Sequence, residues 1–254
     1  MKPILVITMG ATGSGKSKLA KEMISLLKIK NPVYFLIDDY VEKDEGYKRK
    51  IKRFSKKKNL YSKLRNPSKK TLKYFEKAYF HTRKHGCKKR LKKKTIPKNK
   101  CIEISKNGCD RLMDIDLNNA ILKQRDIIFE TTGEYYSKWL IEAINKCKKY
   151  KIVIGGIKVS LNNLVKRNLG RSQDDMRSFI EDDLSGAPRL PDTNKSSLQR
   201  QKSKLNKTLK NIILNGCIKG SKKKNIDFCS KYSIDRLLIF DNNKSLRIIY
   251  DSKK

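Results

Sequence analysis

An eight-residue run near the start of the chain has the residue types and the spacing of a phosphate-binding loop. It matches the pattern G-x-x-x-x-G-K-[ST], and its members are Gly10, Ala11, Thr12, Gly13, Ser14, Gly15, Lys16 and Ser17. Glycines let successive backbone N–H groups point inward at an anion, and the start of a following helix adds positive potential. In this pattern the lysine reaches the β- and γ-phosphates, and the next hydroxyl binds Mg²⁺. The run therefore predicts a nucleoside triphosphate site with Mg²⁺ at Ser17.

The residues on either side of the loop predict the elements that such a loop needs. The apolar run 4–9 predicts a strand that enters the loop, and residues 16–27 predict a helix that leaves it. The alternative is a glycine-rich turn between strand and helix that binds nothing. Because strand, spacing, lysine and serine all agree with the pattern, we favour the nucleotide site.

Two adjacent acids follow the second predicted strand. That strand covers residues 33–37, and Asp38 and Asp39 come directly after it. In an open parallel sheet, ligands bind beyond the carboxyl ends of the strands. A carboxylate there can accept a proton from a substrate hydroxyl or hold Mg²⁺ through water. We expect one of the two acids to be a general base and Asp38 to be a candidate Mg²⁺ ligand, with turn polarity or helix capping as the alternative.

A third predicted strand, residues 126–130, ends in an acid and is followed by two threonines. The acid is Glu130, and the threonines are Thr131 and Thr132. At this position Glu130 can orient metal-bound water or bind a substrate, whereas the alternative is ordinary loop solvation. We expect the three residues to bind the substrate.

A pair of arginines is the last candidate for chemistry. Arg167 and Arg171 are four residues apart, so they share one face of a predicted helix, with Arg177 further along it. Only 14 of the 62 basic residues are arginine, so composition alone would place lysine at these positions. Guanidinium groups stabilise the charge of a phosphoryl-transfer transition state. The alternative is a solvated face that pairs with Asp174 and its neighbours.

The order of the predicted elements places the chain in the α/β class. Strands alternate with helices, which predicts a parallel sheet of the P-loop kinase type with helices on both faces. Residues 1–254 are expected to form a single domain. Lysine runs and interspersed aromatic residues predict a basic, mainly helical insert at about 43–124, after the second strand. Further elements are expected as strands at 151–159, 237–240 and 246–250, helices at 136–148 and 194–215, and a helix cap at Ser160.

The chain is strongly basic, with a formal net charge of +37 over 254 residues. One explanation is nucleic-acid binding, for which basic residues gather on one face. The other is a genome rich in A and T, because Lys, Asn and Ile are all abundant here and all have A/T-rich codons. In either case the charge favours non-specific contact with RNA or DNA.

Six cysteines without a C-x-x-C pair favour a reducing compartment and unpaired thiols. A zinc site at His81, His85 and Cys87, with Cys101 and Cys109, is an alternative, but the cysteine spacing fits no common site. No apolar run has the length of a membrane span, and the run at 4–9 is too short for a signal peptide. We therefore expect a soluble, cytoplasmic protein with no membrane partner.

Several of these pieces together resemble the zeta toxin family of P-loop kinases. They are the phosphate-binding loop, Ile37-Asp38-Asp39, Phe129-Glu130-Thr131-Thr132-Gly133, Arg167 with Arg171, and Leu238-Ile239-Phe240-Asp241-Asn242. The resemblance covers about half of the chain and says nothing about residues 43–124. It implies ATP and Mg²⁺, a five-stranded sheet, an Asp after strand two as general base, and arginines on the phosphates. Bacterial members phosphorylate a hydroxyl of UDP-N-acetylglucosamine. In the family, one residue commonly separates the two acids after strand two, whereas Asp38 and Asp39 are adjacent here.

The residues and the resemblance predict an ATP-dependent kinase that acts on a hydroxyl of a small anionic acceptor such as a nucleotide sugar. Asp39, or else Asp38, would take the hydroxyl proton. Two alternatives stay open: a kinase of nucleic-acid ends with the basic insert as its strand-binding surface, and a non-catalytic, RNA-associated protein that binds a nucleotide. A regulatory GTPase is disfavoured, because the chain has no Asn/Thr-Lys-x-Asp tetrapeptide. The sequence identifies neither the acceptor nor an antitoxin-like partner.

Overall fold

The computed structural model describes residues 2–57, 68–132, 138–181, 194–215 and 234–253. The chain forms two compact units, each with its own internal contacts. Unit 1 consists of Met1–Phe35, Asn118–Val165 and Asn194–Lys254, and unit 2 consists of Leu36–Leu117 and Lys166–Thr193. The prediction that residues 1–254 form a single domain stays a prediction.

Unit 1 is built on a six-stranded sheet that is parallel except at one edge. The strands are β1 (Ile4–Met9), β2 (Val33–Phe35), β3 (Ile127–Thr131), β4 (Lys151–Lys158), β5 (Arg236–Asp241) and β6 (Arg247–Asp251). Their order is β2-β3-β1-β4-β5-β6, with β6 antiparallel to β5. Because β1 lies between β3 and β4, the chain that follows it emerges in the middle of the sheet. The predicted α/β class is confirmed, with an antiparallel strand added to the five parallel ones.

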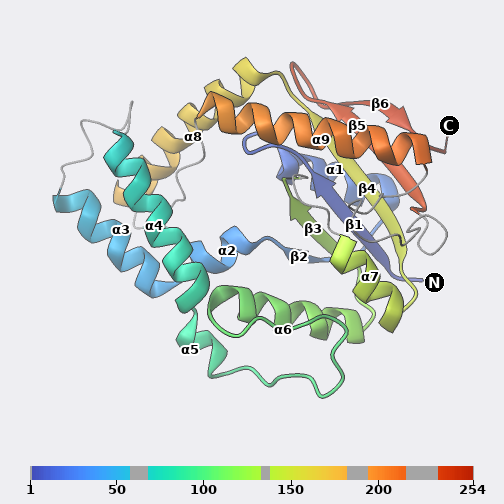
Figure 1. Ribbon diagram of the computed structural model, residues 1–254, viewed down its shortest axis with the longest axis horizontal. Helices are drawn as coiled ribbons and strands as arrows, with labels where there is room; N and C mark the ends of the chain where they lie inside the picture. The colour runs from blue at the N-terminus through green and yellow to red at the C-terminus, as the bar shows by residue number, and fades with distance from the viewer. Residues whose placement is uncertain (1, 58–67, 133–137, 182–193, 216–233, 254) are drawn as a thin grey trace, which may run out of the picture. The chain divides into compact units, whose positions relative to one another are not determined.

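Helices α1 (Lys16–Leu27) and α9 (Lys195–Asn215) cover opposite faces of this sheet (Figure 1). Two adjacent glycines of β4 show the arrangement. A Cβ atom on Gly155 would lie 3.2 Å from Met23 Sδ of α1, and one on Gly156 would lie 2.6 Å from Leu209 Cδ2 of α9. Successive strand residues point to opposite faces, so one helix lies on each side. The prediction of helices on both faces is confirmed.

The core between α1 and the sheet is apolar. Buried side chains from the helix and from four strands build it, among them Val6, Leu19, Met23, Ile128, Val153, Leu238 and Phe240. Strands buried on both faces read as continuous apolar runs, which is why the sequence predicts them well. Helix α7 (Lys138–Cys147) belongs to the same unit and buries Leu140, Ile141 and Ile144.

Unit 2 contains the helices of the basic insert, whose mainly helical nature is confirmed. They are α2 (Ile37–Glu42), α3 (Glu45–Lys57), α4 (Lys69–His85), α5 (Lys88–Leu91), most of α6 (Gly108–Leu122) and most of α8 (Leu161–Glu181). Ser68 begins α4 by accepting a hydrogen bond from Thr71 N at 3.2 Å. Ion pairs join the loops and helices: Arg83 Nε lies 2.8 Å from Asp110, and Lys94 Nζ lies 2.6 Å from Asp116.

The second strand is shorter than the sequence predicts, so the prediction that it runs to Ile37 is wrong. β2 ends at Phe35, and residues 37–42 form α2. Tyr40 is buried on the inner side of this short helix, while Asp38 and Asp39 lie in its first turn. Acidic side chains are favoured there by the positive end of the helix dipole. The two acids therefore begin a helix instead of ending a strand.

The four cysteines of the described residues are disulfide-bonded, so the prediction of unpaired thiols is wrong for them. Cys87 and Cys109 form a disulfide and are 22 residues apart in sequence. Cys101 and Cys147 each take part in a disulfide as well. A reducing compartment, which was inferred from unpaired thiols, loses that support. The zinc alternative loses two of its thiolates, because the bonded sulfurs of Cys87 and Cys109 are no longer thiolate ligands. Among the helices of the described residues, none is long and apolar enough to cross a membrane.

Candidate functional site

The phosphate-binding loop follows β1 in the middle of the sheet. Gly13 and Gly15 have φ angles of +81° and +94°, a region that glycine adopts without a Cβ clash. Gly10 has no space for a side chain, because a Cβ there would lie 2.3 Å from both Ile157 Cγ2 and Ser14 Oγ. Gly15 is the N-cap of α1, so the loop leads directly into the helix start. Geometry therefore requires glycine at all three positions.

Residues at the ends of two other strands hold the loop. Gly10 N donates a hydrogen bond to Thr131 O at 3.1 Å, at the end of β3. Asn242, directly after β5, is buried and donates from Nδ2 to Ser14 O at 2.9 Å. Sequence reasoning assigned no function to Asn242, although a polar residue directly after an apolar strand was a usable signal. Hydrogen bonds from the end of β3 and from the residue after β5 therefore support the shape of the loop.

Lys16 and Ser17 lie in the first turn of α1. Lys16 Nζ donates to Gly10 O at 3.1 Å and to Ala11 O at 3.4 Å, so the ammonium group is folded over the loop. Ser17 is exposed. An ammonium group above the loop and an accessible hydroxyl at the helix start suit a phosphate chain with Mg²⁺. The residues present therefore fit the nucleotide and the metal that the pattern implies.

Sequence reasoning missed Gln201 of α9, which also contacts the loop. Its Oε1 accepts a hydrogen bond from Thr12 N at 3.0 Å and lies 3.3 Å from Thr12 Oγ1. The side chain is only 6% exposed. Gln201 lies three residues after Leu198 and four before Leu205, on the buried face of the helix, and a polar residue at such a position was the available signal. Its amide oxygen contacts a loop N–H group, the kind of donor that binds phosphate.

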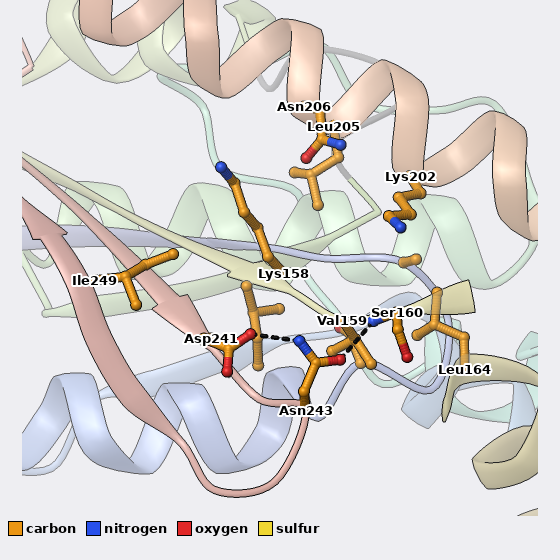
Figure 2. A pocket seen from close by; sticks show the side chains of 13 residues that line it. Lys158, Val159, Ser160, Leu164, Lys202, Leu205, Asn206, Asp241, Asn243 and Ile249 are labelled. Atoms are coloured by element: carbon orange, nitrogen blue, oxygen red, sulfur yellow. Dashed lines mark hydrogen bonds between the residues drawn. The ribbon is translucent and has the colours of Figure 1, made fainter. Parts of the chain in front are cut away.

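A pocket of about 320 Å³ lies beside the loop (Figure 2). Ala11 and Ser14 of the loop, the residues at the ends of β4 and β5, and α9 line it. Its polar side chains are Lys158, Ser160, Lys202, Asn206, Asp241 and Asn243, and its apolar ones include Leu164, Leu205 and Ile249. Such a mixture suits a small molecule with an apolar body and several hydrogen-bonding atoms.

Asn243 organises one side of this pocket. Ser160 N donates to Asn243 Oδ1 at 2.7 Å, and Asn243 Nδ2 donates to Asp241 Oδ1 at 2.6 Å (Figure 2). Ser160 also caps α8 as predicted, because its Oγ accepts from Asn163 N at 3.3 Å. The turn after β5 and the start of α8 are therefore joined by hydrogen bonds.

Glu130, Thr131 and Thr132 lie in unit 1, at the end of β3 and directly after it. In the register of the sheet, Thr8 of β1 is opposite Glu130, so the acid flanks the strand that leads into the loop. All three residues are half-buried. Burial, and then the negative charge of Glu130, raises the pKa of the Tyr34 phenol on β2. The Glu130 carboxylate is therefore close enough to the neighbouring strand β2 to act on Tyr34.

Asp38 and Asp39 lie in unit 2 and differ in their surroundings. The hydroxyl of Tyr79, a buried residue of α4, donates a hydrogen bond to Asp38 Oδ1. Asp38 is half-buried, whereas Asp39 is exposed. An oriented carboxylate suits a metal or its bound water, and an accessible carboxylate suits proton transfer from a substrate hydroxyl. The two neighbours are therefore suited to different tasks.

Arg167 and Arg171 lie on the part of α8 that belongs to unit 2, and Arg177 lies on the same helix. Arg167 is half-buried and Arg171 is exposed. The structure thus brings the phosphate-binding loop together with Glu130, Thr131 and Thr132 in unit 1. It places the predicted acids and arginines in unit 2. Gly133, at the end of the Glu-Thr-Thr-Gly run, lies outside the described residues.

No protein-family model and no curated protein sequence matches the chain. Among solved structures, a chain from the PezAT chromosomal toxin-antitoxin system of Streptococcus pneumoniae is similar at 12% identity and a TM-score of 0.49, over 99% of this chain and 73% of that one. A candidate kinase from Chloroflexus aurantiacus J-10-fl is similar at 12% identity and a TM-score of 0.42, over 96% and 90% of the two chains. At this level of identity, function is inferred from the residues of this chain.

Proposed function

We propose that the chain is an ATP-dependent phosphotransferase that moves the γ-phosphoryl group to a hydroxyl of a small anionic acceptor such as a nucleotide sugar. The observation that carries the proposal is the loop after β1, with Gly13 and Gly15 at positive φ and the Lys16 ammonium folded over it. Bound ATP with Mg²⁺ would supply the phosphoryl group and neutralise part of its charge. An anionic acceptor suits a chain with a net charge of +37.

We assign the nucleoside part of ATP to the pocket beside the loop. Ala11 and Ser14 belong both to the loop and to the pocket wall, so a nucleotide with its phosphates on the loop has its base and sugar within reach. Asn206 and Asn243 offer donors and acceptors for a base edge, and Leu205 offers an apolar surface for the ring. The lining contains both kinds of group that a nucleoside requires.

The remaining roles follow from residue type and surroundings. Asp39 is proposed as the general base, because it is exposed, and Asp38 and Ser17 are each proposed as a Mg²⁺ ligand. Glu130, Thr131 and Thr132 are proposed to bind the acceptor. Arg167 and Arg171 are proposed to neutralise the phosphoryl group during transfer.

Incubation with γ-labelled ATP and a panel of acceptors tests the proposal. The panel contains nucleotide sugars, nucleosides and oligonucleotides with free hydroxyl ends, and Lys16→Ala protein controls for contaminating kinases. Saturable labelling of a nucleotide sugar supports the proposal. Labelling of oligonucleotide ends would replace it by a nucleic-acid end kinase. ATP binding with no labelled acceptor would favour an RNA-associated, non-catalytic protein.

Conservative changes test the arginines. Arg167→Lys and Arg171→Lys keep the charge but remove the planar guanidinium fork that matches a phosphoryl group. We expect at least one of them to lower kcat by about 10-fold or more without changing the thermal stability. Full activity in both variants would assign the pair to a solvated helix face.

A further inference from the structure

A second hollow lies wholly within unit 2, and none of the residues that line it has a role in the proposed function. Its volume is about 360 Å³, and α3, α5 and the end of α4 line it. This size is in the range of sites that hold small molecules. Most of its lining residues are charged or polar, and the stems of their long side chains supply the apolar part of the wall.

The walls carry a marked excess of positive charge. Arg49 and Lys50 come from α3, Lys88, Lys89 and Arg90 come from α5, and His81 and His85 come from α4. The two imidazole rings are 5.0 Å apart. We call this set the basic pocket. Cations from three helices that converge on one hollow are the arrangement that binds multivalent anions.

The acidic residues on the walls already have partners. Asp44 Oδ1 accepts from Tyr47 N at 2.9 Å, and Asp44 Oδ2 accepts from Cys87 N at 2.8 Å. Glu45 pairs with Lys48 at 3.1 Å. Asp44 therefore binds backbone N–H groups and Glu45 binds a neighbouring lysine. The basic residues on the walls outnumber these two acids.

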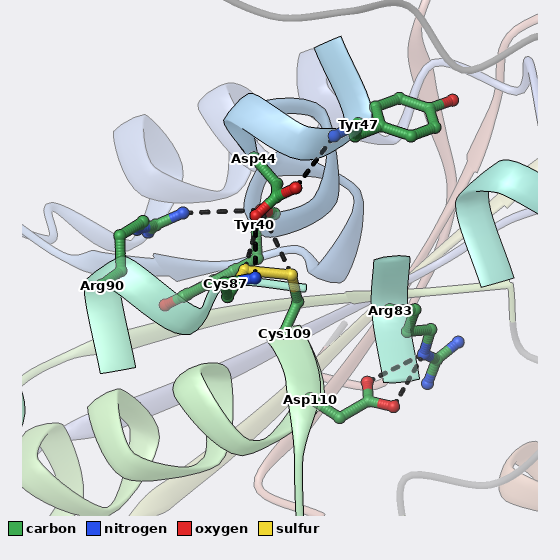
Figure 3. Close-up of a disulfide and its surroundings, with 8 residues drawn as sticks. All are labelled: Tyr40, Asp44, Tyr47, Arg83, Cys87, Arg90, Cys109 and Asp110. Atoms are coloured by element: carbon green, nitrogen blue, oxygen red, sulfur yellow. Dashed lines mark hydrogen bonds and ion pairs between the residues drawn. A yellow bond between two sulfur atoms is a disulfide. The ribbon is translucent and has the colours of Figure 1, made fainter. Parts of the chain in front are cut away.

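The wall formed by α5 is fixed by covalent and polar bonds (Figure 3). Cys87, directly before this helix, forms the disulfide with Cys109 of α6. At the other end, the Arg90 guanidinium carbon lies 5.2 Å from the centre of the Tyr40 ring, and its Nη1 donates to Tyr40 O at 3.4 Å. The cations of α5 are therefore held at the pocket, where their mutual repulsion would otherwise favour separation.

We propose that the basic pocket binds a small polyphosphate, that is, two or three linked phosphate groups on a small molecule, at a site separate from the phosphate-binding loop. A concave site with cations on several sides suits a compact, highly charged anion better than an extended strand, which needs a groove. The proposal does not depend on the proposed function. A nucleic-acid backbone offers the same phosphate chemistry and is the competing outcome of the test.

The histidines make the binding dependent on pH. The neighbouring Lys50 charge is the main cause that lowers the pKa of His81, followed by loss of hydration and by the charges of His85 and Lys88. A bound polyanion has the opposite sign and raises this pKa, because it stabilises the protonated imidazole. Binding therefore takes up protons, and affinity rises as the pH falls through the pKa of His81.

The two histidines also report the binding, since they are the only histidines in the chain. Imidazole Cε1–H signals are followed by NMR while inorganic tripolyphosphate is added to the full chain. We expect both signals to move saturably and the pKa of His81 to rise by about one unit. Calorimetry measures tripolyphosphate binding by the His81→Gln, His85→Gln variant at the same pH values. The pH dependence that remains in this variant belongs to the protonation of tripolyphosphate itself. Unmoved histidine signals at saturating tripolyphosphate would overturn the proposal.

Matched charge changes separate a local site from the general field of a basic protein. Lys50→Gln with Lys89→Gln removes two charges from the pocket, and Lys70→Gln with Lys73→Gln removes two exposed charges from α4 outside it. We expect the pocket variant to bind tripolyphosphate at least about 10-fold more weakly and the control to change less than about twofold. Equal weakening in both variants would reduce the effect to the overall field and would overturn the site.

Two further arms complete the experiment. A single-stranded oligonucleotide replaces tripolyphosphate in the same titration, and tighter binding that the pocket variant weakens would assign the site to nucleic acid instead. Lys16→Ala protein is titrated in parallel, because the loop also attracts phosphates. Histidine shifts that persist in Lys16→Ala protein separate the pocket from the loop. If the histidine signals no longer move in Lys16→Ala protein, the shifts come from phosphate bound at the loop. The basic-pocket proposal would then fail, whatever the outcome of the phosphoryl-transfer assay.

Discussion

The phosphate-binding loop uses backbone groups to attract negative charge, whereas the basic pocket uses side chains. In the loop, glycine conformation and the bond from Asn242 to Ser14 O place the N–H groups. In the pocket, Lys50 and Lys89 contribute charges at the ends of long side chains, and the surrounding helices are held by a disulfide and by Asp44. The first arrangement needs a few residue types at fixed spacing, while the second can be assembled from many sequences.

This difference decides what each region tolerates. A site made from N–H groups depends on local φ angles and fails when one glycine changes. A site made from lysine side chains loses affinity gradually as charges are removed, because each contributes a part of the field. The following variants test the loop, the proposed base and the way in which the insert is held.

The largest effect is expected from Lys16→Ala in the loop. Lys16 is the loop side chain that meets the β- and γ-phosphates in this pattern, so we expect phosphoryl transfer to fall by about 10³-fold or more. The circular dichroism spectrum and melting temperature should stay unchanged. Lys18→Ala, an exposed change two residues further along α1, should keep its activity within about twofold. Undiminished transfer by folded Lys16→Ala protein would refute the loop assignment.

Asp39→Asn tests the base and is expected to lower kcat by about 10²–10³-fold with little change in ATP affinity. The amide keeps the shape of the carboxylate but does not accept the hydroxyl proton. Asp38→Asn is made for comparison, because Asp38 already accepts a hydrogen bond from the Tyr79 hydroxyl. If only Asp38→Asn is impaired, the roles are exchanged. Normal turnover in both variants would rule out the acids as the base.

The double change Cys87→Ser and Cys109→Ser tests how the insert is held. Loss of a cross-link that closes a loop of this length is expected to lower the free energy of unfolding by about 3 kcal/mol. Hydrogen exchange measured residue by residue should show the loss within 36–117, while protection of β1 and β4 and the Kd for ATP stay constant. Equal loss of protection in both units would show that they unfold as one.

The smallest effect is expected from Asn242→Ala. Its loss leaves Ser14 O without the bond from Nδ2, so we expect the Kd for ATP to rise by about 10-fold. Asn162→Ala, an exposed change at the start of α8, is the control and should leave the Kd unchanged. Calorimetry measures both, and an unaltered Kd in Asn242→Ala protein would mean that the loop keeps its shape without this bond.

Unit 1 could be predicted well because its elements follow local patterns. The helix predicted at 16–27 has those bounds, and the one predicted at 194–215 begins one residue later. The strand predicted at 151–159 ends one residue earlier. Apolar runs buried on both faces and a loop defined by three glycines carry their information within a few residues. The phosphate-binding loop could therefore be located from sequence.

The rest depends on partners that are distant in the sequence. Gln201 meets Thr12 across 189 residues, and Asn242 meets Ser14 across 228. A local pattern can mark Gln201 or Asn242 as unusual, but it does not identify the partner of either residue, nor the pairing of Cys87 with Cys109. The end of β2 was misplaced for a different reason: Leu36 and Ile37 are apolar, and a short apolar run is compatible with either a strand or the buried side of a helix.

The bare backbone of β4 at Gly155 and Gly156 has a consequence for mutational scanning. Met23 of α1 and Leu209 of α9 fill the space that a side chain would need on the two faces of the sheet. A side chain at Gly156 forces Leu209 to shift, whereas at Gly155 Met23 has to give by only a few tenths of an ångström. A scan that scores activity alone would therefore rank Gly156 beside the phosphate-binding loop. Scoring the abundance of folded protein in parallel would separate them, since changes at Lys16 would spare abundance and changes at Gly156 would not.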